Sequence, residues 1–338
     1  MGSRATVPLA LGAALLMLVT FAQTGILGQY ALTFLCSMGI YVILSASLNL
    51  VNGYMGEFSC GHAGFMAVGA YASSIAGVFL FVQDPVFGQP WLPMSLTPLA
   101  FPLILAVGFV AAALVGLVVA IPSFKTRGDY LAVITLAAGY IVKSAIENIE
   151  AVGGPRGFMG MKKLVTGMEE VVNLPWMVIW IFLGVVFCIW ILRRFVYSTY
   201  GKGVMAIHQD EVAAEIMSVN TNQMKLVAFM LSSGLAGLAG GLYAYVISFV
   251  NPASFTILRS TECLVMVYLG GMGSLTGSVL AAALFAVLLE FLKPLEQIKW
   301  VAIPLLLILL MQFRPEGLMG NRELSDIFPK LKRYYRFK

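Results

Sequence analysis

A glutamate and a histidine early in the chain are the side chains best suited to acid–base chemistry. Glu57 and His62 are five positions apart, and as a catalytic pair both would have to reach a substrate within hydrogen-bond distance. The sequence contains no G-x-x-x-x-G-K-[ST] phosphate loop, no H-E-x-x-H zinc pair and no G-x-S-x-G elbow. We therefore predict no catalytic residue in this chain, and an enzyme built on Glu57 and His62 is the alternative.

Other reactive side chains lie in or beside apolar runs. Lys143 and Glu147 are four positions apart and can pair on one face of a helix, although they could also line an aqueous cavity. The cysteines form no C-x-x-C motif and no Cys/His cluster, so we predict neither a disulfide nor a metal site. These cysteines are Cys36, Cys60, Cys188 and Cys263.

The composition determines which solvent surrounds the elements that carry these residues. Of the 338 residues 60% are hydrophobic and 11% are charged, and the mean hydropathy is +0.91. An average soluble domain has about a quarter charged residues, so lipid is the solvent that this chain fits. The sequence predicts an all-α polytopic membrane protein.

Apolar runs of about 20 residues, the length that crosses a bilayer as a helix, recur along the chain. One run, 261–292, is too long for one upright span and is broken by glycines at 270–277, which predicts a broken or re-entrant pair of helices. With this pair the chain has 9–10 transmembrane helices. The other spans are predicted near 8–24, 30–50, 60–82, 97–121, 130–149, 174–195, 225–250 and 299–313.

Lysines and arginines orient the bundle, because they accumulate in cytoplasmic loops. The loop that starts at Arg193 and the tail after Phe313 are both rich in them, so both are predicted to be cytoplasmic. An even number of crossings must then separate them. The total becomes ten, with both termini in the cytoplasm.

The predicted domain organisation is simple. One transmembrane domain covers 1–321, with a cytoplasmic loop at 196–224, and a basic cytoplasmic tail covers 322–338. The first apolar run, Val7 to Ala22, could instead be a cleaved secretory signal. We favour a retained span, because no A-x-A-like cleavage site follows it.

Within the cytoplasmic loop, the segment from Gly201 to Met217 is too polar to span a membrane. Asp210 can cap the free N–H groups of a short helix that begins at Glu211. The apolar residues Val212, Ile216 and Val219 form a stripe on that helix. The stripe could dock on a partner, or it could rest on the protein's own spans.

Glycine-rich segments mark two positions where helices are predicted to bend. The segment from Gly53 to Ser59 resembles that from Gly270 to Thr276, and interrupted pairs of this kind often flank the substrate path of a transporter; close packing of glycines is the alternative. A third run, Gly234 to Gly241, predicts close approach of helices. The residues predicted beside a solute pathway are Asn52, Gly53, Tyr54, Glu57, His62, Gly271 and Gly273.

Several segments, in order, carry a resemblance that covers Leu48 to Gly320. The sequence is similar to the permease subunits, of the LivM type, of branched-chain amino acid ABC importers. It departs from the pattern at Glu57, Cys60 and His208, where Gln, Leu and Arg are expected. The matching segments are Leu48 to Gly56, Ser59 to Phe65, Arg127 to Ala132, Gly153 to Gly157, Ala206 to Glu215, Lys225 to Phe229, Leu269 to Ser274 and Phe313 to Leu318.

The resemblance implies a permease subunit in a bacterial inner membrane, in contact with lipid and not with nucleic acid. Its partners would be a second permease, two cytoplasmic ATPases that bind ATP and Mg²⁺, and a periplasmic solute-binding protein. The solute would be a branched-chain or similar amino acid, with urea or short amides as alternatives; a passive channel is an alternative of another class. The implied ATPase-coupling residues are His208, Asp210, Glu211, Ala214, Glu215 and Met217.

Overall fold

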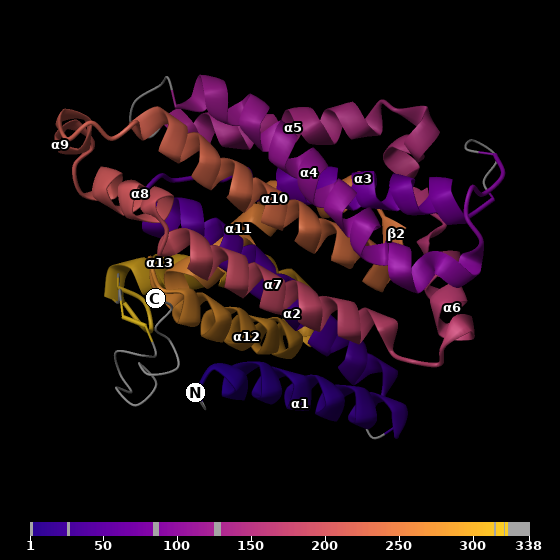
Figure 1. Cartoon of the computed structure of the whole chain (residues 1–338). Coiled ribbons are helices and arrows are strands. Elements are labelled where there is room, and N and C mark those ends of the chain that lie inside the picture. The colour runs from indigo at the N-terminus through magenta and orange to yellow at the C-terminus, as the bar shows by residue number, and fades with distance from the viewer. Residues whose placement is uncertain are drawn as a thin grey trace.

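The computed structural model describes residues 3–25, 28–83, 88–124, 130–313, 316–320 and 322–323, and the chain folds into a bundle of helices (Figure 1). The helices are α1 Ser3–Gln23, α2 Gln29–Asn49, α3 His62–Phe81, α4 Thr97–Ser123, α5 Tyr130–Glu147, α6 Met161–Val171, α7 Trp176–Val196, α8 Thr199–Gln209, α9 Glu211–Ile216, α10 Thr221–Ile247, α11 Ile257–Gly270, α12 Leu275–Leu292 and α13 Glu296–Phe313. A π-helical turn, Leu50–Tyr54, extends α2, and two short strands, β1 Phe158–Met159 and β2 Phe249–Val250, pair with each other.

The prediction of an all-α multi-pass membrane protein is confirmed. Each predicted span corresponds to a helix, and the run 261–292 corresponds to two, α11 and α12. The described apolar parts of α1 and α13, Leu11–Gln23 and Val301–Phe313, are shorter than a full span. Seven helices of the described chain are long and apolar enough to cross a membrane: Gln29–Tyr54, His62–Phe81, Met94–Ser123, Tyr130–Glu147, Trp176–Val196, Thr221–Ile247 and Leu275–Leu292.

Helix α10 lies at the centre of the bundle and packs against α3 and α4. Its small residues permit this, because a methyl group added at Gly237 would meet Ala112 of α4, and one added at Gly69 of α3 would meet Gly237 itself. Near the far end of α10, the buried Tyr245 donates a hydrogen bond of 3.0 Å to the Ser73 carbonyl. The glycine run on α10 therefore serves internal packing of this chain.

The two ends of the bundle are defined by connections that are far apart in sequence. The antiparallel pairing of Phe158 with Val250 joins the α5–α7 connection to the α10–α11 connection. Helices α8 and α9 lie at the opposite end (Figure 1). The strand-bearing connections are thus at one end and the α8–α9 segment at the other, while the cytoplasmic side of the bundle stays a prediction.

The break between α11 and α12 lies at the same end as α8 and α9 (Figure 1). Gly271 and Gly273 have φ values of +107° and +79°, which glycine adopts without the steric cost of a side chain. Ser274 then caps α12 by accepting a hydrogen bond of 3.0 Å from the Gly277 N–H. The predicted broken pair of helices is thus confirmed.

The chain after α13 returns to this break. The Leu318 N–H donates to the Leu269 carbonyl at 2.8 Å, and Glu323 of the predicted tail accepts a hydrogen bond of 2.8 Å from the Leu275 N–H. The remainder of that tail, 324–338, lies outside the described residues.

Two ordered elements lie in the connection 150–173, where the sequence predicted none. They are β1 and the amphipathic helix α6. Helix α6 buries Met161, Leu164 and Met168 against the bundle. Its 11 residues are too few for a span, and this short apolar pattern gives only a weak signal in the sequence.

Candidate coupling site and solute pathway

Two short helices form an elbow at one end of the bundle. Ser198 caps α8 by accepting a hydrogen bond from the Gly201 N–H at 3.3 Å, and Asp210 caps α9 by accepting one from the Ala213 N–H at 3.0 Å. Asp210 has an extended backbone, so it ends α8 and begins α9. The cap predicted for Asp210 is therefore present.

Helix α9 keeps one small residue inside and turns its apolar side chains outward. Ala214 is buried, whereas Val212, Ile216 and Met217 are 66%, 78% and 78% exposed. Val212 and Ile216 of the predicted stripe therefore do not rest on the protein's own spans, whereas its third member, Val219, is half-buried. Val212, Ile216 and Met217 form an apolar surface with no cover from the described part of the chain, which we call the α9 surface.

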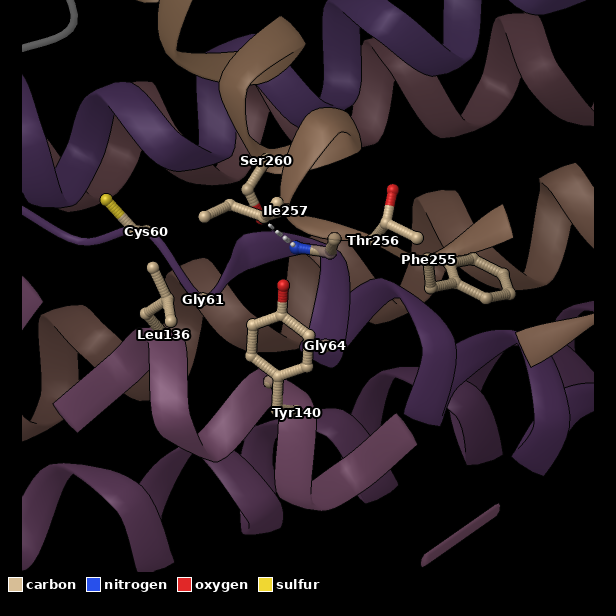
Figure 2. Close-up of a pocket in the computed structure, with 11 residues that line it drawn as sticks. Cys60, Gly61, Gly64, Leu136, Tyr140, Phe255, Thr256, Ile257 and Ser260 are labelled. Carbon is tan, nitrogen blue, oxygen red and sulfur yellow. Dashed lines mark hydrogen bonds between the residues drawn. The ribbon is translucent and has the colours of Figure 1, made fainter. Parts of the chain in front are cut away.

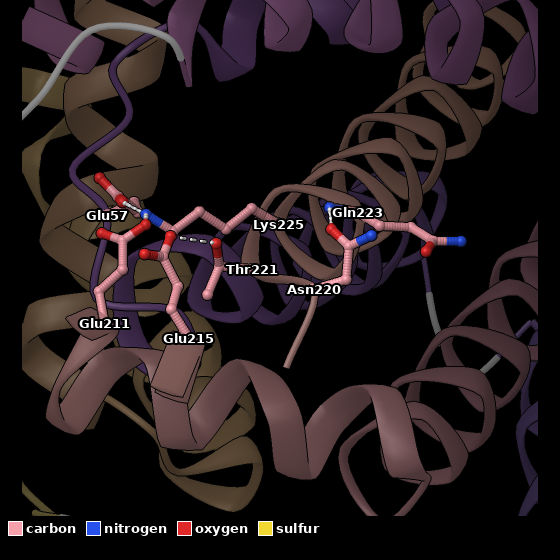
Figure 3. Close-up of polar contacts among 7 residues, drawn as sticks. All are labelled: Glu57, Glu211, Glu215, Asn220, Thr221, Gln223 and Lys225. Atoms are coloured by element: carbon pink, nitrogen blue, oxygen red, sulfur yellow. Dashed lines mark hydrogen bonds and ion pairs between the residues drawn. The ribbon is translucent and has the colours of Figure 1, made fainter. Parts of the chain in front are cut away.

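The base of α9 is fixed to α10 by charged side chains (Figure 3). The Lys225 Nζ of α10 lies 2.9 Å from the Glu211 carboxylate and 2.8 Å from the Glu57 carboxylate. Glu215 accepts a hydrogen bond of 3.1 Å from the Thr221 hydroxyl. Two of the predicted coupling residues, Glu211 and Glu215, are thus held to the first turns of α10.

The segment Met55–Gly61, which joins the π-helical turn to α3, is the other element at this base. It is not helical, and it carries Glu57. His208 of α8 lies against its Gly56, where an added methyl group would come within 2.6 Å of the imidazole Nδ1. The α8–α9 elbow therefore touches this segment directly at Gly56 and indirectly through Lys225.

The two glycine-rich breaks pack against each other. A methyl group at Gly53 would meet the backbone nitrogen of Gly273. The buried Asn49 joins the same two segments, because its Oδ1 accepts from the Gly273 N–H at 3.1 Å and its Nδ2 donates to the Ser274 carbonyl at 2.9 Å. Gly53 of the first break thus meets the second break, which contains the predicted residues Gly271 and Gly273.

The remaining predicted pathway residues have partners of their own. Tyr54 is buried and its hydroxyl donates to Glu323 at 3.2 Å, while Asn52 accepts from the Ser59 N–H at 3.3 Å. His62 is buried, with its Nε2 at 2.8 Å from the Ser47 hydroxyl. Because Glu57 is bound to Lys225 and His62 to Ser47, the two do not form an acid–base pair.

Two further ion pairs lie on helices of the bundle, one partly exposed on α5 and one largely buried on α11. Lys143 and Glu147 on α5 pair at 3.7 Å, as their spacing predicted. On α11 the buried Glu262 binds Arg259 at 2.7 Å, and Arg259 also donates to the Tyr41 hydroxyl at 2.9 Å. Neither Arg259 nor Tyr41 was singled out from sequence, since the arginine precedes the apolar run and its partner is on a distant helix.

A pocket of about 260 Å³, including its open mouth, lies where α3, α5 and the start of α11 meet (Figure 2). The Tyr140 side chain points from α5 toward α3, and Ser260 accepts a hydrogen bond of 3.1 Å from the Ala63 N–H. None of the predicted pathway residues lines it. The lining residues are Cys60, Gly61, Ala63, Gly64, Leu136, Gly139, Tyr140, Phe255, Thr256, Ile257 and Ser260.

Lys225 and Asn49 are the site residues that sequence reasoning did not single out. Both occur inside the segments that carried the family resemblance, but neither stands out by type or spacing. A lysine in the first turns of a span is usually a solvated end residue. Only the fold shows that this one faces two carboxylates, Glu211 of the preceding helix and Glu57 of a segment 168 positions away.

The bundle, with its broken helix pair and an uncovered helix beside it at one end, defines the class of this protein as a multi-pass helical membrane protein. The chain belongs to the branched-chain amino acid transport system permease component family, whose model matches residues 30–312.

Individual relatives agree with this assignment. The chain is 31% identical to the high-affinity branched-chain amino acid transport system permease protein LivM of Escherichia coli, over 83% of this chain and 68% of the relative. It is 25% identical to a probable LivM permease of Methanocaldococcus jannaschii, over 87% and 94% of the two chains. A shorter match, 24% identical over 39% of this chain and 43% of the relative, is to the E. coli permease LivH. No solved structure matches the chain significantly.

Proposed function

We propose that this chain is the transmembrane permease subunit of an ATP-driven importer of branched-chain or similar amino acids. The observation that carries the proposal is the α9 surface, a capped helix that exposes Val212, Ile216 and Met217 next to a bundle that has no nucleotide-binding motif. An apolar surface of this kind, outside the predicted membrane region, is suited to a protein partner. Family membership supports the transport class and the solute.

The partners follow from the same proposal. Two cytoplasmic ATPases bind ATP and Mg²⁺, and one of them docks on the α8–α9 elbow of this chain. The proposed coupling residues of the elbow are His208, Asp210, Glu211, Ala214, Glu215 and Met217, of which Ala214 is buried and acts through the packing of α9. A second permease completes the pathway, and the match of this chain to both LivM and LivH relatives supports a pair of related permeases. A periplasmic binding protein delivers the solute at the end that carries β1, β2 and α6. The chain itself is not catalytic.

The proposed mechanism is a rigid-body switch in a bacterial inner membrane, with both termini in the cytoplasm. Closure of the ATPases pushes α9, and α9 is fixed to α10 through Glu211 and Glu215. Movement of the central helix changes which side of the bundle is open. The solute pathway is proposed beside the junction of the two breaks. The residues predicted to lie along it are Asn52, Gly53, Tyr54, Glu57, His62, Gly271 and Gly273.

Purification and transport test the proposal together. We expect the chain to co-purify with an ATPase in mild detergent. The complex in liposomes, supplied with its binding protein, should take up labelled leucine only with ATP, and unlabelled isoleucine or valine should compete. Uptake without ATP would indicate a channel, competition by urea or acetamide alone would change the solute class, and failure to recover any ATPase would contradict the proposal.

A further inference from the structure

Lys225 holds together two segments that are otherwise separate. Its side chain is only 9% exposed, and it lies between Glu211 of α9 and Glu57 of the Met55–Gly61 segment (Figure 3). A buried lysine needs one carboxylate to neutralise it, and this one has two. With the second carboxylate, the lysine links α9, the helix proposed to contact the ATPase, to the Met55–Gly61 segment.

The Met55–Gly61 segment leads from this link to the pocket. Glu57 is near its start, while Cys60 and Gly61 at its end line the pocket between α3, α5 and α11 (Figure 2). Two contacts fix that end: the Cys60 N–H donates to the Thr135 hydroxyl at 3.1 Å, and an added methyl group at Gly61 would meet the Thr135 carbonyl. The Glu57 N–H donates to the Val51 carbonyl at 3.1 Å and the Ser59 N–H to the Asn52 Oδ1 at 3.3 Å, but the segment forms no helix. Cys60 at the pocket wall is only three residues from Glu57, so a pull on Glu57 has a short path to the pocket.

We propose that Lys225 is a coupling residue, and that the chain of contacts Glu211–Lys225–Glu57 transmits movement of α9 to the pocket wall at Cys60. The proposal rests on the function proposed above, because it needs an ATPase that moves α9. It goes beyond that function by assigning the internal step from α9 to the pocket wall. The contact of His208 with Gly56 supports it, because it gives the elbow a second point of contact on the same segment.

If the ion pairs of Lys225 served only stability, their loss would have a different effect. Loss of such a pair would lower stability and leave the response to ATP intact in whatever complex assembles. A coupling residue, when lost, leaves an assembled complex in which ATP binding no longer changes the pocket. The readout must therefore be the pocket itself and not stability alone.

Cys60 supplies that readout within the natural sequence. Its thiol is partly exposed at the pocket, whereas Cys36, Cys188 and Cys263 are buried. The rate at which N-ethylmaleimide labels Cys60, followed by mass spectrometry of the complete complex in nanodiscs, reports the state of the pocket wall. The rate is measured without nucleotide and with ATP trapped by vanadate.

In the wild-type complex we expect the two labelling rates to differ. In Lys225→Met the difference should disappear, and transport per ATP hydrolysed should fall by roughly fivefold or more, the lower limit of typical coupling between two sites. Glu57→Gln and Glu211→Gln should each have the same effect. The variant that combines both changes should lose no more coupling than either single variant, since residues of one linked unit are non-additive. Lys225→Arg keeps the charge and should restore both readouts.

Lys293→Met is the matched control. Lys293 also pairs with a glutamate, Glu290, at 2.8 Å, but it contacts neither α9 nor the Met55–Gly61 segment, so both readouts should match the wild type. An assembled Lys225→Met complex with wild-type labelling and transport would overturn the coupling role while leaving the proposed function in place. The coupling role would also be overturned if Cys60 of the wild-type complex were labelled at the same rate with and without nucleotide. If no ATPase assembles with the wild-type chain, both proposals fall together.

Discussion

The imidazole of His208 lies directly against Gly56, so that no side chain fits at position 56 without displacing it. A methyl group there would come within 2.6 to 2.9 Å of three atoms of the ring. The contact joins α8, in the segment that we propose docks the ATPases, to the chain that leads into α3. Gly56 also has a φ of +75°, which disfavours any residue with a side chain.

Gly56→Ala should therefore destabilise the protein on two grounds. The left-handed backbone costs an alanine about 1–2 kcal/mol, and the collision with His208 adds to it. We expect a lower midpoint of thermal unfolding in detergent, measured by size-exclusion chromatography after heating. Gly88→Ala is the control, because Gly88 has a similar φ of +82° with nothing within 4 Å of the added methyl group. If both variants lose the same stability, the contact with His208 contributes nothing.

Asn49 is predicted to be essential for the junction of the two breaks. Asn49→Ala removes the partner of the Gly273 N–H, whereas the Ser274 carbonyl keeps the Ser278 N–H and hydroxyl as donors. A buried group left unpaired costs about 1–3 kcal/mol, so we expect a fall in the unfolding midpoint and in the yield of folded protein. Asn148→Ala should stay near the wild type, since Asn148 makes one hydrogen bond on an exposed surface. A stable Asn49→Ala variant would contradict this account of the junction.

Part of the fold could be predicted from the sequence, and part of the site could not. Apolar run length predicted the spans, glycines at 270–277 predicted the break between α11 and α12, and Asp210 predicted the cap of α9. These three features depend mainly on the residues of the segment itself, so a local pattern is sufficient to predict them. Lys225, Asn49 and Arg259 each have a partner far along the chain, at 168, 225 and 218 positions, so no local pattern could identify these contacts.

The α9 surface can be tested without disturbing the fold. In Val212→Asp combined with Ile216→Asp, both changed side chains are exposed, so the unfolding midpoint should shift little; surface substitutions usually stay within about 0.5 kcal/mol. Recovery of the ATPase in a pull-down should be lost, because two charges would enter an apolar contact. Val171→Asp, at an exposed apolar position of α6 on the opposite end, is the control and should retain the ATPase. Full recovery with the double variant would place the docking surface elsewhere.

The cap of α9 gives a prediction about local order. Asp210 satisfies the Ala213 N–H, and replacing a capping residue by alanine costs about 1 kcal/mol of helix stability. A helix of six residues cannot absorb that loss, since short helices are marginal without tertiary support. Asp210→Ala should therefore speed amide hydrogen exchange at 211–216 and weaken ATPase binding, while the α10 amides keep their protection. Asp210→Asn preserves the acceptor oxygen and should behave as the wild type; if its exchange rises as much as that of Asp210→Ala, the charge of Asp210 and not its hydrogen bond holds α9 in place.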